Sequence, residues 1–204
     1  MTESTSAHEE LAWIRSLMEE SQRTLAGTWR HQALWGVLSA GGLLGTWALL
    51  AAGRSTPIGW MWAALLTVGW AGSLWLGRRA RGRAGVRSST GRMFGAVWMG
   101  AGVTLTLIGG AGIWSPTVPQ HILPGVLATV IAAGYFASGF LAGLGWLRGV
   151  AAAWWACGLL FLLLPGPWTL AAMAAAVLLL QVGPALALRR QARAAAPAGR
   201  PVEA

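Results

Sequence analysis

The chain has 204 residues, of which 55% are hydrophobic and only 10% are charged. A soluble domain usually carries about 25% charged residues, so this composition excludes an ordinary water-soluble fold for most of the chain. The formal net charge is +9, yet Lys, Asp and Asn are absent, which excludes a Walker or Schiff-base lysine, an aspartyl phosphate and a Ser-His-Asp triad. The single Cys157 excludes an intramolecular disulfide and a cysteine-rich metal site.

The first 31 residues form an acidic segment that contains five of the six glutamates. Ser6 followed by Glu9 fits a capping box, and apolar residues from Leu11 to Leu25 recur at three- and four-residue steps. The pattern predicts an amphipathic cytoplasmic helix over about residues 7–26, packed against the cytoplasmic end of a bundle, docked on an arginine-rich loop of its own or a neighbouring copy, or presented to a soluble protein. The candidate partner-binding residues are Glu9, Glu10, Glu19, Glu20, Leu11, Ile14 and Met18.

Residues 32–188 contain six apolar blocks, each long enough, or nearly so, to cross a bilayer as a helix of about 20 residues. A helix satisfies its own backbone in lipid, so the blocks predict an all-α, polytopic membrane protein with a six-transmembrane-helix bundle. The fifth block is the shortest. The predicted spans are Gln32–Ala52, Ile58–Gly77, Met93–Ile113, Ile122–Gly145, Gly149–Leu164 and Trp168–Leu188.

Arginine is concentrated on alternate connections between these blocks. The second connection contains the run GRRARGRAGVRSSTGR, the fourth contains Arg148, and a basic tail over residues 189–204, expected to be disordered, follows the sixth block. The positive-inside rule then predicts a multi-pass protein of a bacterial inner membrane with both termini in the cytoplasm. The loop residues Arg78, Arg79, Arg81, Arg83, Arg87 and Arg92 are candidates for contact with the membrane surface or a docking partner. We expect no nucleic acid as a partner, because no aromatic residue interrupts the run as a stacking platform.

Tryptophan gathers near the predicted helix ends, which is typical of indole rings at the level of lipid headgroups. The inner set comprises Trp29, Trp35, Trp75 and Trp146, and the outer set comprises Trp60, Trp62, Trp114 and Trp168. Small residues spaced four apart predict close helix packing; these pairs are Gly41 with Gly45, Gly134 with Ser138, and Gly139 with Gly143.

No ionisable side chain falls near the middle of a predicted span, where transport sites usually place one. The polar residues in the spans are mostly hydroxyls, which we expect to bond to carbonyls of their own helix. A candidate transport site is formed by Gln181, Gly183 and Pro184, because proline removes a backbone hydrogen bond and leaves a carbonyl free near a polar amide. His31 and His121 fall on opposite sides of the predicted bilayer, so we expect no shared metal or cofactor.

Several stretches carry a family resemblance: LAWIRSLMEESQR leading into LWGVLSAGGLLG, the basic loop, ILPGVLATVIAAGYFASGF, and LLFLLLPGPWTLAAMAAAVLL. With this layout the chain resembles an uncharacterised family of bacterial six-helix membrane proteins of about this length, often encoded beside small winged-helix transcription regulators. The resemblance implies topology and a regulator as neighbour, and it implies no catalytic residue.

These patterns favour a non-enzymatic membrane protein that acts as a structural or regulatory partner through its acidic helix and arginine-rich loop. The partners are then the lipid bilayer together with a cytoplasmic protein or a second copy of the chain. The alternative is a small permease or channel for an uncharged or apolar solute, with its site near the Gly-Pro break. A third hypothesis, a lipid-modifying enzyme with His121 as base, lacks an acidic partner on the outer side.

Overall fold

The computed structural model describes residues 13, 15–16, 18–81, 89–115 and 117–194. Every regular element within these ranges is a helix, which confirms the predicted all-α fold. In chain order the elements are α2 (Trp29–Ala51), α3 (Thr56–Arg81), α4 (Ser89–Trp114), the short 3-10 helix η1 (Gln120–Ile122), α5 (Leu123–Leu141), α6 (Gly145–Leu163), α7 (Thr169–Val177), the π-helical turn η2 (Leu178–Val182) and α8 (Gly183–Ala194). Residues 18–26 are helical as well.

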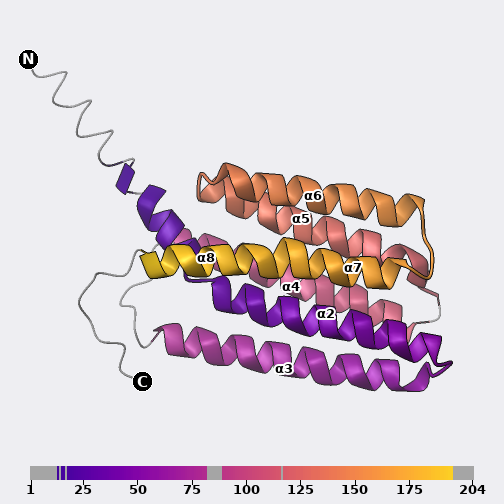
Figure 1. The fold of residues 1–204 in the computed structure, drawn as a ribbon. Coiled ribbons are helices and arrows are strands. Elements are labelled where there is room, and N and C mark those ends of the chain that lie inside the picture. Colours follow the sequence, from indigo (N-terminus) through magenta and orange to yellow (C-terminus); the bar gives the residue numbers. More distant parts are fainter. Residues whose placement is uncertain (1–12, 14, 17, 82–88, 116, 195–204) are drawn as a thin grey trace, which may run out of the picture.

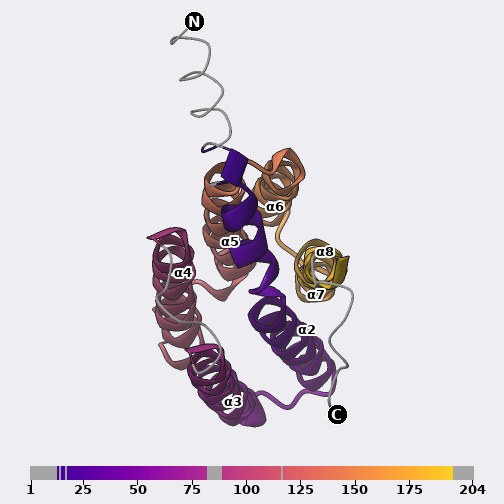
Figure 2. The same cartoon turned by 90° about the vertical axis from the view of Figure 1, so that its left-hand side faces the viewer.

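The long helices lie side by side as one antiparallel bundle, in which α7, η2 and α8 form a single continuous rod (Figure 1). Seen from the end in Figure 2, the rods are arranged around the bundle in the order α2, α3, α4, α5, α6 and α7–α8. Helix α2 contacts α3 on one side and the α7–α8 rod on the other. It therefore lies between α3 and the α7–α8 rod.

The closest pair of helices is α5 with α6, and glycine explains their approach. A Cβ atom added to Gly158 would lie 3.0 Å from the methyl group of Thr129 and 3.2 Å from the carbonyl oxygen of Gly125. A Cβ atom added to Gly125 would meet Leu162 and would lie 2.9 Å from the carbonyl oxygen of Gly158. Because neither residue has a Cβ, the two backbones pack directly against each other.

The small-residue pairs predicted from the sequence play other parts. Gly134 and Ser138 both face the indole of Trp98, whereas the position of a Cβ on Gly41 is open space. Gly143 has a φ of +64° and forms the turn between α5 and α6. Gly139 of the predicted pairs does pack closely on α6, because a Cβ there would lie 3.1 Å from the backbone nitrogen of Arg148. The Gly125–Gly158 contact was not among the predicted pairs.

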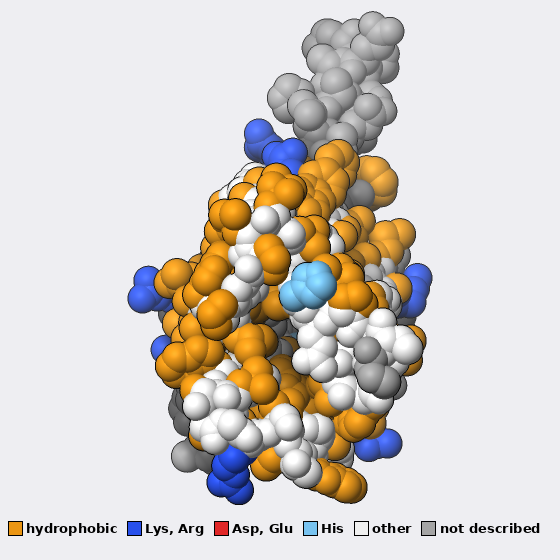
Figure 3. Space-filling view, turned by 90° about the vertical axis from the view of Figure 1, so that its right-hand side faces the viewer, with side chains coloured by type: hydrophobic (Ala, Val, Ile, Leu, Met, Phe, Trp, Pro, Cys, Tyr) orange, Lys and Arg blue, Asp and Glu red, His pale blue; other side chains and the backbone are white. Residues whose placement is uncertain are grey.

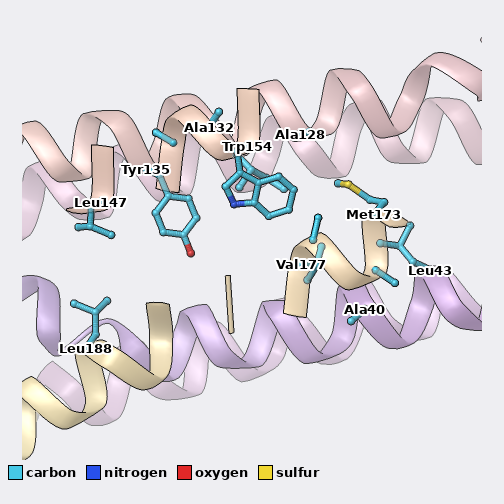
Figure 4. Close-up of a cluster of buried hydrophobic side chains, with 14 of the residues drawn as sticks. Ala40, Leu43, Ala128, Ala132, Tyr135, Leu147, Trp154, Met173, Val177 and Leu188 are labelled. Carbon is cyan, nitrogen blue, oxygen red and sulfur yellow. The ribbon is translucent and has the colours of Figure 1, made fainter. Parts of the chain in front are cut away.

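Large side chains fill the space between α5–α6 and the helices that face them. Figure 4 shows Tyr135 and Trp154 reaching from α5 and α6 toward Val177 and Met173 of α7 and toward α2. Trp154 is completely buried, and the exposed fraction of Tyr135 is 1%. These aromatic residues form the centre of the hydrophobic core.

Five helical rods are long and apolar enough to cross a membrane: Trp29–Ala51, Thr90–Trp114, Gln120–Leu141, Gly145–Leu163 and Thr169–Arg193. Helix α3 is not among them although it has 26 residues. Four Trp and four Gly occupy its apolar stretch, and these residues contribute less hydropathy than aliphatic side chains. The coarse prediction of a multi-pass, all-helical chain is supported by these five rods.

Two predicted boundaries are wrong. The fourth span was expected to reach Gly145, but α5 ends at Leu141 because residues 142–144 form a turn. Helix α6 therefore begins at Gly145, four residues before the predicted fifth span, and has 19 residues. The basic tail predicted from residue 189 is not irregular at its start, because α8 continues through Arg189 and Arg190 to Ala194.

Candidate functional site

Arginine is segregated to one end of the bundle. Of the eleven arginines for which side chains are described, ten belong to segments that meet at the end where α2, α4 and α6 begin and α3, α5 and α8 finish. The exception is Arg54, in the connection between α2 and α3 at the opposite end. Figure 3 looks onto that opposite end and shows mainly hydrophobic and uncharged polar side chains around a central hollow, with arginine only near the outline. We call the end at which these ten arginines gather the arginine end.

The helical residues 18–26 pack against the arginine end. Leu25 and Ala26 are buried, with exposed fractions of 1% and 4%, and Ser21 is buried as well. Met18 lies near the α5–α6 turn, where its terminal methyl group would be 2.9 Å from a Cβ on Gly143. This segment is therefore anchored to the bundle by its apolar side chains.

The charged residues of the same segment face outward. Glu19 and Arg23 form an ion pair with 3.6 Å between the carboxylate oxygen and the guanidinium nitrogen, and both side chains are about two-thirds exposed. Glu20 is exposed too. The candidate residues Glu9, Glu10, Leu11 and Ile14 of this segment lie outside the described residues.

Trp29, at the start of α2, is flanked by two arginines. The guanidinium carbon of Arg30 lies 5.3 Å from the centre of the Trp29 indole, and that of Arg189 from α8 lies 5.2 Å from it. Both distances are within the range of a cation–π interaction. Beside them, His31 Nε2 lies 3.3 Å from the backbone carbonyl oxygen of Ser73, which joins α2 to α3.

The arginine loop is described only at its two ends. Arg78 and Arg79 are exposed at the end of α3, and the guanidinium of Arg79 stacks over Trp75, 5.3 Å from the ring centre. Arg92 is exposed in the first turns of α4. Arg81 closes α3, but its side chain lies outside the described residues, as do Arg83 and Arg87 entirely. The predicted docking of the acidic segment on this loop therefore stays a prediction.

The candidate transport residues lie in the interior, where most of their hydrogen-bonding groups have partners. Gln181 has an exposed fraction of 6%, and its Nε2 donates to the backbone carbonyl oxygen of Gln32 over 3.5 Å. The Tyr135 hydroxyl donates to Gln32 Oε1 over 3.2 Å. Pro184 is buried and Gly183 is exposed. Among the described residues, no buried side-chain nitrogen or oxygen lacks a partner.

The carbonyl freed by proline also has a partner. Pro184 has no amide hydrogen to donate to the carbonyl four residues earlier, which belongs to Leu180. The indole Nε1 of Trp154 donates to that oxygen over 3.3 Å. An indole from α6 thus occupies the Leu180 carbonyl, whereas the Gly183 amide bonds five residues back to the Leu178 carbonyl in the π-helical turn. The prediction of a free carbonyl beside Gln181 stays a prediction. The rod bends into a π-helical turn over Leu178–Val182 and continues without a break.

Hydrogen bonds from tryptophan indoles also link successive helices, and the sequence did not predict them. In each case an indole Nε1 donates to a hydroxyl oxygen on the adjacent helix: Trp35 to Ser73 (2.9 Å), Trp62 to Thr46 (2.9 Å), Trp70 to Thr106 (3.3 Å) and Trp98 to Ser138 (3.0 Å). Thr46 and Thr106 also donate to carbonyls of their own helices, as expected for hydroxyls in a span. These two threonine hydroxyls are therefore donors to their own helix and acceptors from its neighbour.

Two tryptophans assigned to the headgroup level thus belong to helix packing. The ring of Trp35 lies against Gly69, and the ring of Trp62 lies against Gly42, where an added Cβ would come within 2.7 Å in each case. In each case a tryptophan of one helix packs on a glycine of the neighbouring helix. The sequence contains both residues, but pairing them requires knowing which helices are neighbours.

The histidines do not belong to a metal-binding cluster in the part of the chain that the structure describes. No group of three or more His, Cys or Glu side chains could hold a metal ion there. His31 lies in the first turn of α2 at the arginine end, whereas His121 lies in η1 at the opposite end. Their separation matches the prediction that they do not share a ligand.

The fold defines a class, an all-helical chain whose five long apolar rods suggest a multi-pass membrane protein. Comparison with known proteins adds no narrower assignment: no protein-family model matches the chain, and neither the curated proteins nor the solved structures give a significant match. The function must therefore be argued from the side chains.

Proposed function

We propose that the chain is a six-span protein of the bacterial inner membrane with both termini in the cytoplasm. It acts without catalysis, as a membrane-embedded partner of a cytoplasmic protein that it binds through its N-terminal segment. The observation that carries this proposal is the segregation of arginine to one end of the bundle, together with a helical segment anchored there by its apolar residues.

Helix α3 supplies the sixth crossing in this proposal. It follows α2 after a connection of four residues and returns to the arginine end, from which α4 starts. Its 26 residues extend about 39 Å, which exceeds the ~30 Å thickness of the hydrocarbon core. If α2 and α4 cross the membrane, α3 has to cross it between them.

The orientation follows from charge. Cytoplasmic connections carry an excess of Arg and Lys, and among the described side chains ten arginines but only Glu19 and Glu20 gather at the arginine end. Each arginine near an anionic leaflet is attracted by about 1 kcal/mol. The opposite end, with Arg54 and the proline-bearing connections, then faces the periplasm.

A protein is the partner that the N-terminal segment fits. Its buried residues hold it to the bundle, so Glu19 and Glu20 are presented to solvent at a fixed place. An amphipathic helix that binds membrane carries a basic polar face, and an anionic leaflet repels these carboxylates. The resemblance to a family encoded beside winged-helix regulators makes such a regulator a candidate.

The interior favours this proposal over transport. A solute site requires polar groups that are available to the solute, whereas the Gln181 amide nitrogen and the Leu180 carbonyl are already engaged by Gln32 and Trp154. These contacts give the sixth rod a structural role.

The test variant lacks residues 1–17 and carries Glu19→Gln and Glu20→Gln, and this N-terminal truncation is compared with a variant that lacks residues 195–204. The N-terminal truncation keeps Ser21, Leu25 and Ala26, so we expect both variants to insert in membranes as well as the full chain. A protein captured by the full chain from native membranes should be lost from the N-terminal truncation and kept by the C-terminal one. Equal capture by both truncations would contradict the proposal.

A further inference from the structure

Two guanidinium groups stack on the indole of Trp29 and bring two positive charges to one place. Arg30 lies on α2 and Arg189 on α8, so two separate helices bring their charges to one ring. Their guanidinium carbons are at most about 10.5 Å apart, the sum of the two distances to the ring centre. A guanidinium that stacks on an aromatic face still directs its N–H groups outward along its edge, where they match phosphate oxygens.

Within the described residues, no carboxylate pairs with either of these two arginines. The ion pair in that part of the chain is Glu19 with Arg23. Arg30 also lies in the first turn of α2, which contains no acidic residue. The helix dipole disfavours a cation in that turn, and Arg190 on α8 adds a further positive charge nearby. A negatively charged ligand would relieve this repulsion.

Apolar side chains lie beneath the two arginines on the same helix faces. Val37 follows Arg30 by seven residues, and Leu186 precedes Arg189 by three, spacings that keep residues on one face of a helix. The exposed fractions of Val37 and Leu186 are 59% and 47%. An amphiphile with its phosphate at Trp29 would lay its hydrocarbon chains over these residues, toward the centre of the bundle.

We propose that Trp29, Arg30 and Arg189 bind the headgroup phosphate of an anionic phospholipid. The two guanidinium groups donate hydrogen bonds to the phosphate oxygens, the indole holds both guanidiniums in place, and the acyl chains cover Val37 and Leu186. This inference uses the proposed membrane embedding, but it does not depend on a protein partner, and its test uses purified protein alone.

The experiment titrates the purified full chain in a non-ionic detergent with phosphatidylglycerol and counts bound lipids by native mass spectrometry. Phosphatidylcholine, which is zwitterionic and has no net charge, is the control, and inorganic phosphate is the arm that separates a lipid from a free ion. We expect phosphatidylglycerol to bind in preference to phosphatidylcholine, and inorganic phosphate to compete only weakly. Displacement of the lipid by inorganic phosphate at equal concentration, or equal binding of the two lipids, would overturn the lipid assignment.

Matched charge removals locate the site. The double variant Arg30→Gln/Arg189→Gln should bind phosphatidylglycerol about tenfold more weakly, whereas Arg78→Gln/Arg79→Gln removes the same charge at the same end and should change binding less than about twofold. Equal losses in the two variants would show diffuse attraction and overturn the proposal. Should the first double variant unfold, Arg189→Lys keeps the charge without the planar fork, and wild-type affinity in that variant would contradict the stacked geometry.

Discussion

The bond between Trp154 and the carbonyl of Leu180 predicts a specific energetic coupling to Pro184. Replacing Trp154 by Phe removes the indole donor from that half-buried carbonyl. An unpaired buried group costs about 1–3 kcal/mol. The Nε1–oxygen distance of 3.3 Å is longer than the usual 2.9–3.0 Å, and measured side-chain hydrogen bonds in membranes average about 0.6 kcal/mol. We therefore expect the bond to contribute about 1–2 kcal/mol.

The double-mutant cycle isolates this bond from the change in ring size. In a Pro184→Ala background the new amide hydrogen at position 184 can pair with the Leu180 carbonyl, so Trp154→Phe should cost about 1–2 kcal/mol less than it does with proline present. The packing loss from indole to phenyl is common to both backgrounds and cancels. The free energy of unfolding is measured by SDS titration in mixed micelles, followed by far-UV circular dichroism. Equal costs in the two backgrounds, within about 0.3 kcal/mol, would refute the reasoning.

Further substitutions test packing and the indole bonds by the same unfolding assay. Gly125→Ala places a methyl group against the α6 backbone and should destabilise the chain by about 1–3 kcal/mol, whereas Gly41→Ala enters open space and should be neutral or stabilising by up to about 1 kcal/mol. Equal effects at the two glycines would argue against direct α5–α6 contact. Ser138→Ala removes the acceptor of the Trp98 indole and should cost about 1 kcal/mol, while Thr67→Ala, whose hydroxyl bonds only to its own helix, should change stability by less than about 0.5 kcal/mol. A neutral Ser138→Ala would show that the indole bond contributes nothing.

Hydropathy and charge were sufficient to predict the helices. Apolar runs of about 20 residues predicted the six rods, since every connection except that between α5 and α6 is polar or contains proline. The errors fell at the α5–α6 turn, where LAGLGWL remains apolar and Gly143 alone supplies the turn conformation. Helix α8 was underestimated for the opposite reason, because arginine is polar but favours a helix.

The contacts between helices could not be predicted, because they depend on which faces meet. Trp35 and Trp62 lie near helix ends, where headgroup level is the ordinary assignment, and only their positions against Gly69 and Gly42 reveal their packing role. The flanking of Trp29 by Arg189 joins residues 160 positions apart in the chain. Periodicity within one helix contains no information about such a pair.

Labelling of single cysteines tests the central claim, a membrane bundle whose arginine end faces the cytoplasm. In a Cys157→Ser background, Ser55→Cys places a thiol in the connection between α2 and α3, and Ser88→Cys places one in the arginine loop. An impermeant maleimide should label the first in intact spheroplasts and the second only after lysis. Labelling of Ser88→Cys in intact spheroplasts, or recovery of the chain in the soluble fraction without detergent, would contradict the account.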